Sequence, residues 1–207
     1  MDKIAIISDI HGNWAGLQAV LADIEGCRCD RIVCLGDLVD GGNFNDKVVR
    51  FFRDNHIVCV RGNHDEFNDL VLAEDVRSFL MQLPESVAED DAVYTHISPR
   101  KKNKVSNCIE AWNVFDETPH RLVFVGHVHV PLIFGERSEE FGSATCYNFK
   151  YGEPFLLEGE DRHIISVGAV GYSRDRLQKL RYAIYNKRDR TVEFRAVDGE
   201  LLPFGWL

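Results

Sequence analysis

The chain lacks the long hydrophobic runs and paired cysteine motifs that would place it in a membrane or around a structural zinc ion. No stretch approaches the ~20 consecutive apolar residues of a transmembrane helix, so we expect no membrane partner. The first apolar run is under way after Lys3, which leaves no room for a signal peptide, and we expect a cytoplasmic protein. The cysteines should then be reduced thiols, and Cys27-Arg28-Cys29 has no distant partner pair to complete a zinc site. Three of the six cysteines are expected on or beside buried strands: Cys34, Cys59 and Cys146.

Positive charge and domain linkers are also scarce. The chain has 24 basic and 33 acidic residues, a formal net charge of −9, which argues against nucleic acid as a partner. No internal repeat, low-complexity tract or linker divides the 207 residues, so we expect a single domain over residues 1–207. Hydrophobic residues make up 45% of the chain, which is sufficient for a large core.

The first half of the chain alternates short apolar runs with helical patterns, an order that is typical of a parallel sheet. Asn13 should cap a helix that ends near Gly26, and a second helix should begin at Asn43. Further helices are expected over residues 73–83 and 106–115. Short strands are expected after Arg121, over residues 132–134, 144–149, 163–167, 181–185 and 191–196, with a hairpin at 186–189. These later strands predict a second, largely antiparallel sheet packed on the first, and the apolar tail at 201–207 should cover the core.

Five polar motifs each follow a short apolar run that is typical of a buried strand. They are Asp9-x-His11, Gly36-Asp37, Gly62-Asn63-His64-Asp65, Thr95-His96 and Gly126-His127-Val128-His129. In an open α/β sheet, ligands bind beyond the carboxyl ends of the strands. Five strands would therefore bring Asp, His and Asn side chains to one rim, and this pattern predicts a metal site.

The number of these side chains favours two metal ions over one. Two-metal hydrolytic centres hold their ions roughly 3.5–4 Å apart and clamp the attacking and leaving oxygens of a displacement. Asp37, alone on its loop, could bridge two ions across that distance. Mixed imidazole and oxygen ligands favour transition metals over magnesium or calcium. We expect two divalent ions, manganese first, with iron, zinc, cobalt or nickel as alternatives.

The order of these motifs resembles the calcineurin-like metallophosphoesterases. The segment Ser8-Asp9-Ile10-His11-Gly12-Asn13 is similar to the small bacterial-type phosphodiesterase and diadenosine-tetraphosphatase-like branch, as is the glycine-rich block at 166–175. The matched motifs extend from residue 8 to residue 175. The resemblance implies an α/β fold, a four-layer α/β/β/α sandwich of two mixed sheets flanked by helices.

The resemblance also implies a role for each motif residue. The first metal would be held by Asp9, His11, Asp37 and His129, and the second by Asp37, Asn63, His96 and His127. A hydroxide between the ions would attack the phosphorus, and His64 would protonate the leaving group or stabilise the transferred phosphoryl oxygens. Asp40 would hydrogen-bond His64 and fix its ring, with Asp65 as the competing candidate.

Two departures from the family pattern bear on the substrate. The protein-phosphatase branch has an arginine where this chain has Gly41, and such an arginine clamps phosphate bidentately. The residue after His96 is Ile97, not the glycine of small-phosphodiesterase relatives, and a basic stretch follows at 100–104. This stretch either replaces the clamp or is a solvated loop, and we favour the loop.

The remaining candidates are arginines and histidines outside the ligand motifs. Arg61 and Arg174 are the candidate substrate contacts, although for Arg61 we favour pairing with an acid at the rim. The three histidines outside the motifs, His56, His120 and His163, should be surface or strand-end residues.

Four functions are therefore weighed. The leading hypothesis is a dinuclear-metal phosphoesterase that hydrolyses a small phosphodiester or nucleotide. A dinucleoside polyphosphate hydrolase is a near alternative, and Gly41 argues against a serine/threonine protein phosphatase. A non-catalytic interaction scaffold on the same fold is the fourth, but no predicted ligand position has been lost.

Overall fold

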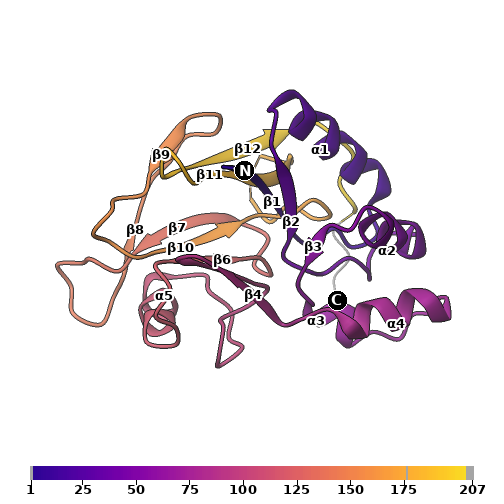
Figure 1. Cartoon of the computed structure of the whole chain (residues 1–207), viewed down its shortest axis with the longest axis horizontal. Helices are drawn as coiled ribbons and strands as arrows, with labels where there is room; N and C mark the ends of the chain where they lie inside the picture. Colours follow the sequence, from indigo (N-terminus) through magenta and orange to yellow (C-terminus); the bar gives the residue numbers. More distant parts are fainter. Residues whose placement is uncertain (1, 176, 204–207) are drawn as a thin grey trace.

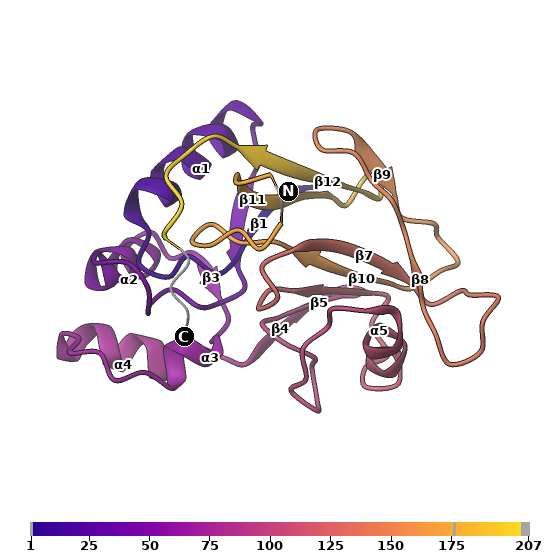
Figure 2. The same ribbon diagram turned by 180° about the vertical axis from the view of Figure 1, so that it is seen from behind.

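The computed structural model describes residues 2–175 and 177–203 and contains two six-stranded mixed sheets packed face to face (Figure 1). Helices lie on the outer face of each sheet, as the view from behind also shows (Figure 2). This arrangement is the four-layer α/β/β/α sandwich that the sequence predicts.

The first sheet joins strands from the two ends of the chain. Its order is β3 (Val58–Cys59), β2 (Arg31–Cys34), β1 (Lys3–Ile7), β11 (Leu180–Asn186), β12 (Thr191–Val197) and β9 (Pro154–Leu156). The pairs β1–β2 and β2–β3 are parallel, whereas β11 pairs antiparallel with β1 and with β12. The parallel pairs come from the predicted βαβαβ beginning of the chain.

The second sheet corrects the expectation of a largely antiparallel late sheet. Its order is β4 (Ser86–Glu89), β5 (Ala92–Thr95), β6 (Leu122–Val125), β10 (His163–Val167), β7 (Pro131–Gly135) and β8 (Thr145–Cys146). Strands β5, β6 and β10 are parallel neighbours, and the late strands are divided between the two sheets. The error arises because alternating or apolar patterns identify a strand without identifying its partner.

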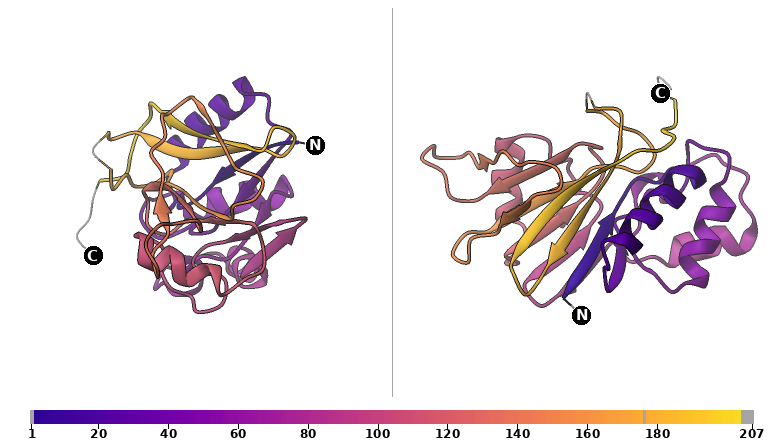
Figure 3. Two further views of the ribbon diagram at one scale, coloured as in Figure 1. Left: turned by 90° about the vertical axis from the view of Figure 1, so that its left-hand side faces the viewer. Right: turned by 90° about the horizontal axis from the view of Figure 1, so that it is seen from above.

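Five helices accompany the sheets: α1 (Trp14–Gly26), α2 (Asn45–Asp54), α3 (Asn63–Glu66), α4 (Glu74–Gln82) and α5 (Cys108–Phe115). Asn13 caps α1 as predicted, because its Oδ1 accepts a hydrogen bond of 2.9 Å from Gly16 N. Figure 3 shows α1 along the outer face of the first sheet and α5 on the opposite side of the molecule. Helix α2 begins at Asn45 and not at the predicted Asn43, since residues 41–44 form a loop whose carbonyl at Gly42 accepts a hydrogen bond from Asn45.

The core lies in three layers that follow from the pattern of the buried strands. In β1, Ile4 and Ile6 face the second sheet, while Ala5 and Ile7 face α1 and α2. A third apolar cluster joins α5 to the outer face of the second sheet. A strand that is buried on both faces reads as a continuous apolar run, which is why these runs could be recognised in the sequence.

Several local expectations need correction. Cys34 and Cys59 are buried, but Cys146 is exposed because β8 covers only Thr145–Cys146 at a sheet edge. His163, expected at the surface or at a strand end, is the buried first residue of β10 and is thus a strand-end residue, as expected. Leu201 packs against the α1 side of the core, while residues 204–207 of the apolar tail lie outside the described part of the chain. Among the described residues, no helix is long and apolar enough to cross a membrane.

Candidate metal centre

The loops that follow β1, β2, β3, β5 and β6 bring all the motif residues together. Each strand ends one to four residues before the first predicted metal ligand of its motif, so the short loops leave the polar side chains little freedom. All seven predicted metal ligands lie in two adjoining clusters, with His64 and Asp40 beside them. The predicted convergence on one rim is therefore present in the structure.

The first cluster consists of Asp9, His11, Asp37 and His129, all buried. One ligand atom from each lies within 4.8 Å of the others. His129 Nε2 is 3.0 Å from Asp9 Oδ1 and 3.3 Å from His11 Nε2. Four donor atoms around one point, two of them carboxylate oxygens, match a divalent transition metal.

The second cluster shares Asp37 and adds His96 and His127, again within 4.8 Å. Asn63 completes it, because Asn63 Oδ1 lies 2.9 Å from His127 Nδ1 and 3.0 Å from His96 Nε2. Asp37 Oδ2 lies 3.1 Å from His96 Nε2 and 3.8 Å from His11 Nε2. One carboxylate oxygen thus faces both clusters, as a bridging ligand must.

Backbone carbonyls orient two of the imidazoles. The Nδ1 of His11 faces the carbonyl oxygens of Val39 and Asp40 at 3.1 and 2.8 Å, and that of His96 faces the carbonyl of Leu35 at 2.7 Å. Carbonyls only accept, so each Nδ1 must donate its proton, and in the neutral ring Nε2 carries a lone pair. Both free Nε2 atoms face the cluster interiors, which is the orientation that a metal ligand requires.

The electrostatics of the clusters also fit a pair of cations. Burial opposes ionisation of Asp9, yet the neighbouring imidazoles, His129 foremost, hold its pKa well below its usual range. Burial also disfavours the charged form of His96, but the Asp37 carboxylate raises its pKa to about 10. The buried Asp37 Oδ2 has no hydrogen-bond partner among the described residues. Buried carboxylates and mutually facing imidazole nitrogens are compensated when divalent cations lie between them.

The backbone of the centre carries a feature that the residue types did not reveal. Five of the predicted ligands have left-handed φ angles between 52° and 69°: Asp9, His11, Asp37, His127 and His129. Non-glycine residues seldom adopt this region, although Asp and His tolerate it better than most. Such local strain concentrates at functional sites, and here it turns each side chain from the strand end toward the rim.

Asp65 joins the loops after β2 and β3, whereas the ring of His64 is hydrogen-bonded to Asp40. Its carboxylate accepts hydrogen bonds of 2.8 to 2.9 Å from the backbone N–H groups of Asp37, Leu38 and Gly62. Burial and the nearby Asp37 charge together raise its pKa to about 6. Asp65 therefore fixes the geometry of the bridging loop.

The ring of His64 is held by Asp40, as the sequence analysis expects. His64 Nδ1 lies 2.7 Å from Asp40 Oδ2, and both side chains are about 30% exposed, at 29% and 31%. The backbone N–H of His64 also donates to Asp37 Oδ1 at 2.8 Å. The ring centroid lies 5.1 Å from that of His11, so His64 borders the first cluster with its Nε2 available.

The two predicted substrate arginines lie in different surroundings. Arg61 Nε is 3.3 Å from Glu66, and its Nη2 is 3.7 Å from Glu85, so the rim pairing is present. Arg174 is exposed in the loop after β10. A substrate contact stays a prediction for both. Within the basic stretch, Lys102 pairs with Glu85 at 2.9 Å, as in an ordinary loop.

Tyr172 is a site residue that the sequence analysis did not single out. Its ring is stacked on His129, with centroids 5.9 Å apart and planes at 11°, and it meets the edge of His11 at 5.0 Å. It belongs to the glycine-rich block at 166–175, which was noted only as a family resemblance. Because Tyr172 is distant from the ligands in sequence, no spacing rule could have placed it there.

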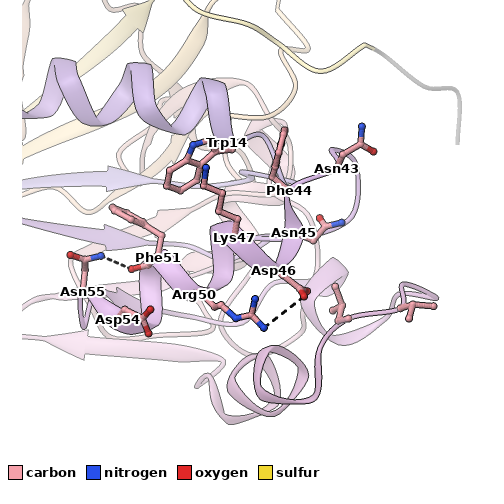
Figure 4. Close-up of a pocket in the computed structure, with 12 residues that line it drawn as sticks. Trp14, Asn43, Phe44, Asn45, Asp46, Lys47, Arg50, Phe51, Asp54 and Asn55 are labelled. Atoms are coloured by element: carbon pink, nitrogen blue, oxygen red, sulfur yellow. Dashed lines mark hydrogen bonds and ion pairs between the residues drawn. The ribbon is translucent and has the colours of Figure 1, made fainter.

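One cavity adjoins the centre, and a separate groove lies beside α2. A cavity of about 150 Å³ lies beside Asn63 and His96, with Phe67 and Ile97 as apolar lining. A wider groove of about 710 Å³ is lined by Trp14, Phe44 and residues of α2 (Figure 4). Asn45 links this groove to the centre, because its side chain accepts a hydrogen bond of 3.1 Å from the backbone N–H of Asp40.

Comparison with known proteins identifies the family. Residues 2–190 match the model of the calcineurin-like phosphoesterase superfamily domain. The chain is 30% identical to the protein MJ0912 of Methanocaldococcus jannaschii, over 96% of this chain and 88% of that protein. A metallophosphoesterase from Sphaerobacter thermophilus has the same fold, with a TM-score of 0.86 and 30% identity over 96% of this chain and 89% of that one.

A more distant structure, described as a novel archaeal phosphodiesterase, shares the fold at a TM-score of 0.53 and 16% identity, over 94% of this chain and 99% of that one. The family match covers most of the chain and includes every predicted ligand. The chain therefore belongs to the calcineurin-like phosphoesterase superfamily and is a hydrolase that acts on phosphoester bonds.

Proposed function

We propose that this protein hydrolyses a small phosphodiester with the help of two divalent transition-metal ions, manganese being the first candidate. The observation that carries the proposal is the position of Asp37, whose Oδ2 faces both clusters at 3.1 and 3.8 Å. The seven residues of the two clusters would hold the ions. When bound, such ions neutralise phosphoryl oxygens and lower the pKa of water enough to supply a nucleophile near neutral pH.

The general acid in this proposed reaction is His64. Asp40 fixes its Nδ1 at 2.7 Å, so its Nε2 points away from Asp40 and can give a proton to the leaving oxygen. Helix α3 carries both Asn63 and His64, which ties the acid rigidly to the second cluster. General acid catalysis of this kind typically contributes about 10²–10⁴-fold in rate.

The cavity beside Asn63 and His96 supports a diester as the substrate. It is lined by Arg61 and Lys102, which pair with Glu66 and Glu85 and so leave no unbalanced positive charge for a further phosphate. Phe67 and Ile97 offer apolar contact to an uncharged ester substituent instead. These contacts favour a diester over a polyphosphate.

The groove of Figure 4 favours a second candidate, a nucleotide substrate such as a dinucleoside polyphosphate. Trp14 and Phe44 present aromatic rings there, and Lys47 Nζ lies 4.2 Å from the Trp14 ring centroid. Aromatic rings beside a cation provide a surface on which a nucleobase can stack. Asn45 lines this groove and accepts a hydrogen bond from the backbone N–H of Asp40, the partner of His64.

The test is hydrolysis by metal-stripped protein that is reloaded with manganese, iron, cobalt, zinc or magnesium. The substrates are bis(p-nitrophenyl) phosphate, p-nitrophenyl phosphate, a phosphopeptide and a dinucleoside tetraphosphate. His64→Gln and Asp40→Asn should lower kcat about 10²-fold or more on the best substrate. His120→Gln, a histidine outside both clusters, is the matched control. Unchanged turnover in His64→Gln would refute this mechanism, and the best substrate decides between diester and dinucleotide.

A further inference from the structure

Tyr172 stands beside the first cluster in a loop that is fixed to the ligand segment. The backbone N–H groups of Val170 and Gly171 donate to the carbonyls of Ser8 and Asp9 at 3.1 and 2.7 Å. Further along, the wholly buried Arg181 pairs with Asp175 at 2.9 Å. Tyr172 is thus presented by a preorganised loop and not by a free surface segment.

The hydroxyl of Tyr172 lies over Gly41, next to Asp40. A Cβ atom at residue 41 would collide with this hydroxyl oxygen, so only glycine leaves room for it. Within residues 2–175 and 177–203, the hydroxyl has no hydrogen-bond partner.

A partly buried donor without an acceptor, beside a cluster that would hold a cation, is suited to an anionic oxygen. We infer that the Tyr172 hydroxyl donates a hydrogen bond to a phosphoryl oxygen of the substrate on the first-cluster side of the centre. This inference rests on the proposed function. It gives the protein a neutral donor beside residue 41, a glycine that has no side chain to contact the phosphate. It also makes Tyr172 a substrate-binding residue.

If Tyr172 had only a structural role, its substitutions would have different effects. The Tyr172 ring packs on His11 and His129, so loss of the whole ring would disturb the first cluster. Loss of the hydroxyl alone would leave that packing unchanged. Tyr172→Phe therefore tests the hydrogen bond, and Tyr172→Leu tests the packing.

The decisive measurement is binding of inorganic phosphate to the manganese-loaded protein by titration calorimetry, which does not depend on turnover. A hydrogen bond to a charged group contributes about 1.5–3 kcal/mol, so Tyr172→Phe should weaken phosphate binding about 10–150-fold. It should bind as much manganese as the wild type. Tyr94→Phe, which removes another buried phenol hydroxyl, is the matched control and should bind phosphate normally.

Steady-state kinetics on the best substrate give the second readout. Loss of a preorganised donor should lower kcat/KM of Tyr172→Phe about 10-fold or more. Wild-type affinity and kinetics in Tyr172→Phe would overturn the inference, and so would loss of manganese in that variant, because the hydroxyl would then be structural. If the wild type binds phosphate but turns over no substrate, the proposed function fails while the binding result still decides the role of Tyr172.

Discussion

At the scale of single residues, the metal centre depends on close approach between loops that belong to different strands. Gly126 precedes the His127–His129 pair, and a Cβ atom there would collide with Ser8 Oγ and lie 2.8 Å from Asp9 Oδ2. The ligand segments after β1 and β6 can therefore touch only if residue 126 has no side chain. The left-handed φ of Asp9 and His127 reflects the same crowding.

Replacement of Gly126 by alanine should lower the free energy of unfolding by about 1–3 kcal/mol, because overpacking forces the two segments apart. It should also weaken metal binding. Gly26→Ala at the end of α1 is the matched control, since nothing lies within 4 Å of a Cβ there. Urea unfolding and metal titration of both variants provide the check, and equal stability of the two would contradict this view of the loop contact.

At the scale of secondary-structure elements, α1 is fixed to the first sheet by a polar contact as well as by its apolar face. Asp23 accepts hydrogen bonds from the Tyr182 hydroxyl at 2.6 Å and from Arg195 at 2.9 and 3.0 Å. Partial burial opposes its ionisation, but these donors lower the pKa of Asp23 below its ordinary value of 3.8. The charged carboxylate therefore stabilises the folded protein.

Asp23→Asn should reduce the free energy of unfolding by about 1–2 kcal/mol at pH 7. A carboxylate with a lowered folded pKa stabilises the protein above its unfolded pKa and loses this effect as the pH falls through its folded pKa. The difference between wild type and variant should therefore be constant above pH 5 and shrink below about 3.8. Urea unfolding at several pH values measures it, and a difference that persists unchanged at pH 3 would exclude the ionised Asp23 as its cause.

The elements also show what the sequence could predict and what it could not. The runs before Asp9 and His127 were recognisable because strands buried on both faces are continuously apolar. The pairing partners of the strands could not be predicted, since β10 pairs with β6 and β7 across long sequence separations. Tyr172 was missed for the same reason, because its place beside His129 depends on the pairing of β10 and not on a local motif.

At the scale of the whole molecule, the centre gathers buried carboxylates whose charge bound cations would balance. The formal net charge is −9, and two buried carboxylates lie among the ligands. One rim collects residues from both sheets, so bound ions would join the two halves of the sandwich. Ligands that bind only the folded state stabilise it by mass action.

Manganese should therefore raise the melting temperature of the metal-stripped protein. At about 100 times the dissociation constant, the stabilisation is about 2.7 kcal/mol, which corresponds to about 5–10 °C for a chain of this size. Asp37→Asn, which weakens the shared ligand, should show a much smaller shift. Differential scanning calorimetry with and without manganese tests this expectation, and an equal shift in both proteins would place the ions elsewhere.

A two-metal phosphoesterase bridged by Asp37 requires two ions per chain for turnover, and a metal titration measures this requirement. The initial rate of phosphodiester hydrolysis is measured while manganese is added stepwise to metal-stripped protein at a concentration well above the dissociation constants. We expect no turnover without metal and a rate that reaches its plateau at two equivalents per chain. A plateau at one equivalent, or undiminished turnover without metal, would contradict it.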